Sequence, residues 1–274
     1  MTDSVQTAGP VPPAARTPAA VRPRLGATSR RDAWWLQPVL VALGLAAFGV
    51  YSTWAAFQGV NYEWGPVEGL PVYLSPFYSP LFTPEWWPLS PALLILWAPL
   101  GFRATCYYYR KAYYRAFFLD PPACAVGEAR GHGYRGETAF PFILQNVHRY
   151  FLYLALIFIG ILSYDAALAF TRWPRAGGGT GFGAGLGSLI MLANVILLAG
   201  YTFGCHSLRH AVAGKLDCFS CGALGGARYD LWRGVNVLNQ RHMLWAWMSL
   251  TSVGVTDLYI RLVASGVVAD PRLL

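Results

Sequence analysis

Long apolar stretches separated by shorter polar or glycine-rich connections dominate this chain. A helix that crosses a bilayer takes about 20 mostly apolar residues, and five stretches meet that length: roughly 34–57, 88–108, 142–170, 185–208 and 239–264. Hydrophobic residues make up 55% of the chain and charged residues only 12%, which is too apolar for an ordinary soluble domain. The pattern predicts an all-α integral membrane protein whose five transmembrane helices occupy residues 33–274.

Basic residues gather on one side of the predicted bundle. The connection 58–102 holds three glutamates and no basic residue. The connections after the second and fourth stretches carry Arg103, Arg110, Lys111, Arg115, Arg130, Arg135, Arg209, Lys215, Arg228, Arg233 and Arg241. Short cytoplasmic loops are enriched in lysine and arginine, so we expect these two connections and the N-terminus to face the cytoplasm. Arg172 and Arg175 on the other side are a weak exception to this multi-pass arrangement.

The first 32 residues are rich in Ala, Pro, Thr and Arg and contain no sustained apolar run, which predicts a disordered cytoplasmic tail. The first apolar run begins at Trp34 and is too long for a signal peptide, so we expect no cleavage. The net charge of +8 raises the question of nucleic acid. Basic residues beside membrane spans are explained by anionic headgroups, so no nucleic-acid partner is expected.

The predicted outer side carries two features of its own. Residues 61–91 alternate prolines with aromatic residues, which excludes a long helix and favours a loop lying in the headgroup region, or else one that covers an outer ligand pocket. Asp165 and Asp257 lie deep in the third and fifth stretches, where a charge needs a partner. Asp257 precedes Arg261 by four residues, a spacing that permits an ion pair. The alternative is a second ligand site, or a proton path, near the outer face.

All five cysteines and all five histidines fall at or just beyond the predicted cytoplasmic ends of the helices. Two cysteines with two histidines match either a tetrahedral zinc site or a Rieske-type [2Fe-2S] centre. Histidines alone allow a b-type haem, for instance His148 or His242 against His206. Purely structural roles stay open too. Disulfides are not expected on a reducing side, and the Cys218/Cys221 CxxC indicates zinc or redox chemistry.

Several motifs are long and unusual: TCYYYRKAYYRAFF, PPACAV, FPFILQNVHRY, CHSLRH, LNQRHM and DLYIRLVASG. Over roughly residues 34–274 they resemble the five-helix, SdhC-like membrane anchor of actinobacterial-type succinate dehydrogenases. The resemblance implies a subunit that docks the flavoprotein and iron-sulfur subunits and passes succinate-derived electrons to quinone. It also implies a membrane-embedded Rieske-type cluster in place of haem. The ligands it implies are Cys106, Cys124, His206 and His210, with His148, His242, Cys205 and the Cys218/Cys221 pair as substitutes.

A quinone ring needs a hydrogen-bond donor at its carbonyls and a source of protons. His148 and His242, beside Arg149 and Arg241, supply both in this prediction, and Trp245 packs against the ring. The chain has no dinucleotide-binding pattern, so it does not oxidise succinate itself. Two other functions stay open: a haem b quinone oxidoreductase subunit of another respiratory complex, and a zinc-binding or structural membrane protein.

Overall fold

The structure is a computed structural model. It describes residues 24–65, 69–128, 138–140, 142–175, 178–214, 216, 218–222 and 224–274. Residues 1–23, most of the predicted disordered tail, lie outside this description. Residues 26–30 differ from that prediction, because they pair with residues 124–127 through Gly26 N–H to Gly127 O (3.0 Å) and Thr28 Oγ1 to Ala125 O (2.8 Å).

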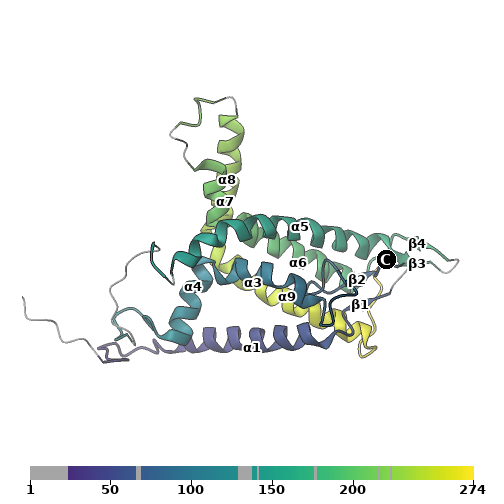
Figure 1. Ribbon diagram of the computed structural model, residues 1–274, viewed down its shortest axis with the longest axis horizontal. Coiled ribbons are helices and arrows are strands. Elements are labelled where there is room, and N and C mark those ends of the chain that lie inside the picture. The colour runs from purple at the N-terminus through teal and green to yellow at the C-terminus, as the bar shows by residue number, and fades with distance from the viewer. Residues whose placement is uncertain are drawn as a thin grey trace, which may run out of the picture.

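Four long helices run side by side (Figure 1): α1 Leu36–Gln58, α5 His148–Thr171, α6 Leu186–Phe203 and α9 His242–Ala264. Among the described helices, three are long and apolar enough to cross a membrane: Leu36–Gln58, Ile143–Thr171 and Leu186–Phe203. α6 packs between α5 and α9, so the core lies along these three helices. Large apolar side chains such as Leu43 and Val50 on α1 are exposed, as expected for a surface in contact with lipid.

The second predicted span is not one continuous helix. It consists of α2 Ala92–Ile95, α3 Trp97–Ala104 and α4 Tyr107–Tyr113, and the π-helical turn η1 Tyr114–Phe118 follows it. Cys106 between α3 and α4 has an extended backbone, with φ −67° and ψ 132°. The sequence pattern did not reveal this break, because both sides of it are apolar or aromatic.

Two further helices project away from the bundle (Figure 1): α7 His206–Ala213 and α8 Gly225–Gln240. The Arg228 side chain donates to the Val212 carbonyl (2.8 Å), and the Asn239 side chain donates to the Gly204 carbonyl (2.8 Å). The first bond joins α8 to α7, and the second fastens α8 to the end of α6. The sequence analysis missed α8, although Tyr229, Trp232 and Val235 recur at helical spacing along one face.

The end of the bundle near Asp165, Asp257 and Asp270, here called the aspartate end, is closed by the proline-rich loop. Its strands β1 Glu63–Trp64 and β2 Tyr73–Leu74 pair antiparallel, as do β3 Trp173–Pro174 and β4 Thr180–Gly181. Tyr73 and Tyr78 are completely buried. The prediction of a loop lying on the membrane surface was therefore wrong for residues 71–79, although Phe82 and Trp86 further on are exposed.

Hydroxyl groups explain why this loop is buried. Ser75 donates to Asp257, Ser79 donates to Asp165, and Tyr73 donates to Asp270 at 2.7 Å. Arg261 pairs with Asp257 at 2.8 Å, which confirms the ion pair predicted from their spacing. Because an unpartnered carboxylate inside a membrane protein is costly, the loop hydroxyls stabilise the buried Asp165 and Asp257 carboxylates, the second of them together with Arg261.

Candidate functional site

The opposite end of the bundle, here called the histidine end, brings together two helix breaks and two helix starts. Cys106 separates α3 from α4, and Cys205 separates α6 from α7 with nearly the same extended backbone (φ −67°, ψ 138°). His148 is the first residue of α5, preceded by the short 3-10 helix η3 Phe142–Val147, and His242 is the first residue of α9. Each thiol and each imidazole is therefore placed by a helix terminus.

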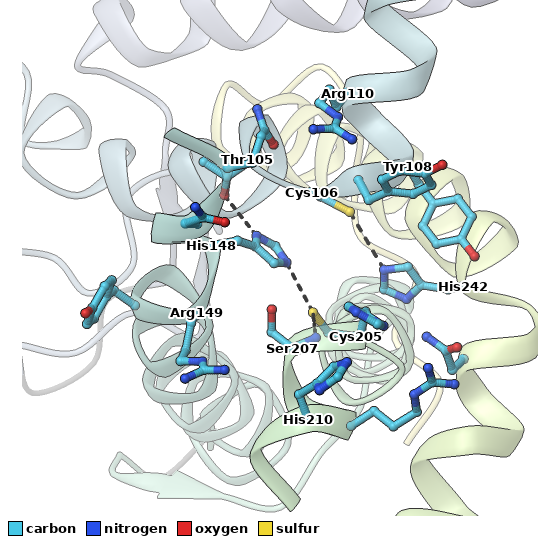
Figure 2. Close-up of a pocket in the computed structure, with 17 residues that line it drawn as sticks. Thr105, Cys106, Tyr108, Arg110, His148, Arg149, Cys205, Ser207, His210 and His242 are labelled. Atoms are coloured by element: carbon cyan, nitrogen blue, oxygen red, sulfur yellow. Dashed lines mark hydrogen bonds between the residues drawn. The ribbon is translucent and has the colours of Figure 1, made fainter. Parts of the chain in front are cut away.

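These four side chains form two cysteine–histidine contacts, drawn as dashed lines in Figure 2. His148 Nε2 lies 3.2 Å from Cys205 Sγ, and His242 Nε2 lies 3.8 Å from Cys106 Sγ. All four side chains are buried. They line one cavity of about 860 Å³, here called the Cys/His cavity, with residues of α4, α5, α7 and α8 completing its wall.

Hydrogen bonding fixes the tautomer of His148. The Thr105 hydroxyl has one proton, which it donates to the Gly101 carbonyl at 2.7 Å. The same oxygen lies 2.9 Å from His148 Nδ1, so Nδ1 carries the ring proton and donates it. His148 Nε2 therefore presents its lone pair towards Cys205, the state in which an imidazole binds a metal.

His242 has one ring nitrogen without a partner among the described residues. Its Nδ1 is buried and makes no hydrogen bond within the described part of the chain. Its ring stacks on Tyr201 with centroids 5.0 Å apart, and the His148 ring stacks on Phe102 at 4.7 Å. Burying an imidazole nitrogen without a partner is unfavourable unless a ligand completes it.

The structure brings three of the four predicted metal ligands to the Cys/His cavity. Cys106 is buried in its wall, while His206 and His210 are exposed on α7 at its margin, with ring centroids 4.4 Å apart. Cys124 differs from the prediction, because it is exposed and does not line the cavity. Its backbone carbonyl accepts a hydrogen bond from Arg30 (2.9 Å). Cys205, a substitute in the sequence analysis, takes the second buried thiol position instead.

Within the described residues, no three His, Cys, Asp or Glu side chains are grouped closely enough to hold one metal ion together. The geometry provides two separate cysteine–histidine pairs. Two thiols and two imidazoles are the donor set of a Rieske-type centre, which spreads its ligands over two irons. Their kind and number also match a zinc site with two cysteine and two histidine ligands; against a single ion stands only that no three of these side chains are grouped among the described residues.

Only some of the residues predicted to bind quinone line the Cys/His cavity. His148, Arg149 and His242 line the Cys/His cavity, whereas Arg241 and Trp245 do not. Trp245 packs on α6, where a Cβ atom added to Gly200 would lie 2.8 Å from its ring. Its indole N–H is buried without a partner in the described part of the chain.

Cys218 and Cys221 lie in the loop between α7 and α8, away from the cavity, and form a disulfide. This pairing differs from the expectation that the cytoplasmic side carries no disulfides.

Gly204 positions Cys205 by close backbone packing. A Cβ atom at this position would lie 2.8 Å from the Gly200 carbonyl oxygen and 3.2 Å from the Leu238 backbone. We expect Gly204→Ala to destabilise the protein by about 1–3 kcal/mol, because backbone atoms cannot move aside. Gly234→Ala is the matched control, since a Cβ there meets nothing within 4 Å and alanine favours the helix. Thermal unfolding in detergent measures both; equal midpoints for the two variants contradict the expectation.

The apolar helices and the Cys/His cavity define a class: α-helical integral membrane proteins with a candidate cofactor site at one end of the helix bundle. A family model described as actinobacterial succinate dehydrogenase subunit SdhC matches residues 36–266. The chain therefore belongs to the actinobacterial SdhC family, and it is a membrane anchor subunit of succinate dehydrogenase.

A solved structure supports the same assignment. A chain of the Mycobacterium smegmatis Sdh1 complex in the apo form is 42% identical and superposes with a TM-score of 0.78. The match covers 94% of this chain and 98% of that chain. No curated protein matches. The resemblance seen in the sequence motifs is thereby confirmed at the level of the family.

Proposed function

We propose that this anchor carries electrons from an iron-sulfur subunit to a membrane quinone through a Rieske-type [2Fe-2S] cluster held in the Cys/His cavity. The observation that carries the proposal is the pair of buried cysteine–histidine contacts, Cys205 with His148 and Cys106 with His242. These four residues are the proposed ligands. They replace Cys124, His206 and His210 of the sequence-based set, because they are buried together in the cavity wall, whereas those three are exposed.

A cluster of this kind supplies reversible one-electron storage. The residues of this chain orient the ligands, donate hydrogen bonds to them and exclude water. Thr105 orients the His148 ring through Nδ1, and the Ser207 backbone N–H donates to Cys205 Sγ at 3.4 Å. Donors to sulfur and to the ligand imidazole tune affinity and reduction potential. Phe102 and Tyr201 cover the two imidazoles and exclude water from that side.

The proposal includes the arrangement in the membrane. Five spans, with α2–α4 as the second and α9 as the fifth, place the histidine end and the N-terminus in the cytoplasm of a bacterial cell. The arginine asymmetry of the loops supports this orientation. The flavoprotein and iron-sulfur subunits then dock at the histidine end, beside the projecting α7 and α8, and electrons enter close to the Cys/His cavity. Lipid surrounds the exposed apolar helix faces.

Two alternatives use the same side chains. A b-type haem would take His148 and His242 as axial ligands and leave both thiols unused. Alternatively, the cavity receives the quinone itself, with His148, Arg149, Arg241, His242 and Trp245 around the ring. The haem alternative does not explain why each histidine contacts a cysteine thiol. The quinone alternative requires Arg241 and Trp245 to line the cavity, which they do not.

The test is a cofactor analysis of the intact complex, with iron, zinc and haem content and electron paramagnetic resonance spectra after dithionite reduction. We expect a Rieske-like signal in addition to the clusters of the iron-sulfur subunit, and no zinc. A Soret band with two histidine ligands would establish the haem alternative. A complex with no iron beyond that of the partner subunits would contradict the proposal.

A further inference from the structure

The α7–α8 hairpin runs crosswise to the long helices at the histidine end (Figure 1). α7 begins three residues after α6 ends at Phe203, and α8 ends at Gln240, two residues before α9 begins. Both roots of the hairpin therefore lie at the ends of long apolar helices, where a helix that crosses a membrane reaches the membrane surface. α8 has 16 residues, about 24 Å of helix. Because it leaves crosswise, it stays at the level of that surface along its length.

α8 carries an apolar stripe that is exposed towards the tip of the hairpin. Leu224, Ala227 and Leu231 recur at three- and four-residue spacing, so they share one face. All three are exposed, Leu224 at 72% and Leu231 at 57%. The same face continues to Val235, which is buried near the root of the hairpin. An apolar face that is covered at one end and exposed at the other indicates a further binding partner.

Another side of α8 is polar. Asp230 and Arg233 lie there, 3.8 Å apart, and both side chains are more than half exposed. Gly226 precedes Arg233 by seven residues and so lies on the same side, where a Cβ atom would meet nothing within 4 Å. An apolar stripe on one side and exposed charges on another are typical of a helix that lies in the membrane interface.

The hairpin is held together by its own contacts. Phe219 of the connecting loop packs against Tyr229 and Trp232 of α8, with ring centroids 5.2 and 6.1 Å away. Arg228 joins α8 to the Val212 carbonyl of α7. The stripe is therefore presented on a folded arm, and a substitution at an exposed stripe position leaves the contacts that fold this arm in place.

α4 at the same end supports this level of the membrane surface. It also runs crosswise (Figure 1) and exposes Tyr107 and Lys111, four residues apart on one face. Aromatic and basic side chains are enriched where a protein meets lipid headgroups. Two crosswise elements therefore indicate one membrane surface at the histidine end.

We propose that the α7–α8 hairpin is a membrane-surface arm whose stripe of Leu224, Ala227 and Leu231 inserts into the phospholipid leaflet at the histidine end. Asp230 and Arg233 then face water. The inference requires that α6 crosses the membrane, and it is independent of the proposed cluster. A partner subunit or a second copy of this chain would bury the same stripe. The level of the hairpin with the end of α6 favours lipid, and the experiments distinguish these occupants.

The first experiment identifies what contacts the stripe. The photoreactive amino acid p-benzoylphenylalanine replaces Leu224 or Leu231, and Gly226 or Arg233 as matched controls on the polar side. The intact complex is irradiated in nanodiscs of phosphatidylglycerol and phosphatidylethanolamine, and its peptides are analysed by mass spectrometry. We expect adducts of phospholipid mass at Leu224 and Leu231 and none at Gly226 and Arg233. Crosslinks from the stripe to a partner subunit or to a second copy overturn the inference, as does equal lipid labelling, or none, at all four positions.

The second experiment measures how firmly the arm is held. Leu231→Glu places a charge against the leaflet, whereas Arg233→Glu places the same charge in water. We expect amide hydrogen exchange of residues 225–235 in nanodiscs to become about tenfold faster in Leu231→Glu, since part of a leucine's burial is lost, and to stay unchanged in Arg233→Glu. Dye-coupled succinate oxidation reports that both complexes remain assembled. Equal exchange rates in the two variants contradict insertion of the stripe.

Discussion

Replacing Cys205 by serine is expected to reduce quinone reduction by the assembled complex at least about 100-fold, in the range seen when metal-site residues are altered. The Rieske-like signal should disappear as well. The physical reason is that Cys205 is a buried thiol 3.2 Å from His148, whose Nε2 lone pair faces it. Serine retains the volume and loses the soft donor that iron-sulfur clusters require.

Cys124→Ser is the matched control, and it separates the two ligand sets. Cys124 is exposed and lies outside the Cys/His cavity, so the signal and the activity should persist. Dye-coupled succinate oxidation reports whether the partner subunits remain assembled. If Cys124→Ser removes the signal while Cys205→Ser keeps it, the ligand set implied by the sequence motifs is correct and the one read from the contacts is wrong.

Removing Asp257 is expected to destabilise the membrane domain by about 3–5 kcal/mol, the cost of leaving one member of a buried ion pair alone. Asp257→Ala strands Arg261 and also removes the acceptor of Tyr51 (2.6 Å) and Ser75. The Asp257 side chain is fully buried and that of Arg261 is 7% exposed, so water cannot replace the lost partner. Thermal unfolding of the purified complex in detergent measures the effect.

The chain offers a control with similar spacing. Asp230 and Arg233 on α8 are 3.8 Å apart, and both side chains are more than half exposed. Asp230→Ala should cost less than about 1 kcal/mol. A double variant, Asp257→Leu with Arg261→Met, should recover much of the lost stability if the stranded charge is the cause. Equal losses of unfolding free energy in Asp257→Ala and Asp230→Ala would show that the buried ion pair stabilises the protein no more than the exposed one.

The sequence predicted the helical membrane class and the Asp257–Arg261 pair well, because both follow from short-range patterns. Apolar runs report burial in lipid, and a four-residue spacing reports a shared helix face. The same kind of pattern placed His148, His206, His210 and His242 correctly at the ends of helices, while His132 lies outside the described residues. What it left open was which side chains meet, since Cys205 contacts a histidine 57 positions earlier in the chain.

Three features of the structure could not be predicted from short-range patterns in the sequence. The break at Cys106 has no proline or glycine to mark it, and the extended residue is maintained by packing at the start of α5 and α9. Cys124 was predicted as a ligand from the resemblance to the family, whereas in the structure its thiol is exposed and its carbonyl accepts from Arg30 of the N-terminal segment. The loop at residues 71–79 looked interfacial because its hydroxyl–carboxylate partners lie far along the chain.

That last feature sets an order for biogenesis. A ribosome completes Tyr73, Ser75 and Ser79 long before Asp165, Asp257 and Asp270, the carboxylates that receive their hydrogen bonds. The hydrogen bonds of this loop to Asp257 and Asp270 therefore form only after α9 and the residues behind it have been made. Only the arrival of α9 and the residues after it closes the aspartate end, so the last-made part of the polypeptide locks a segment made near the beginning.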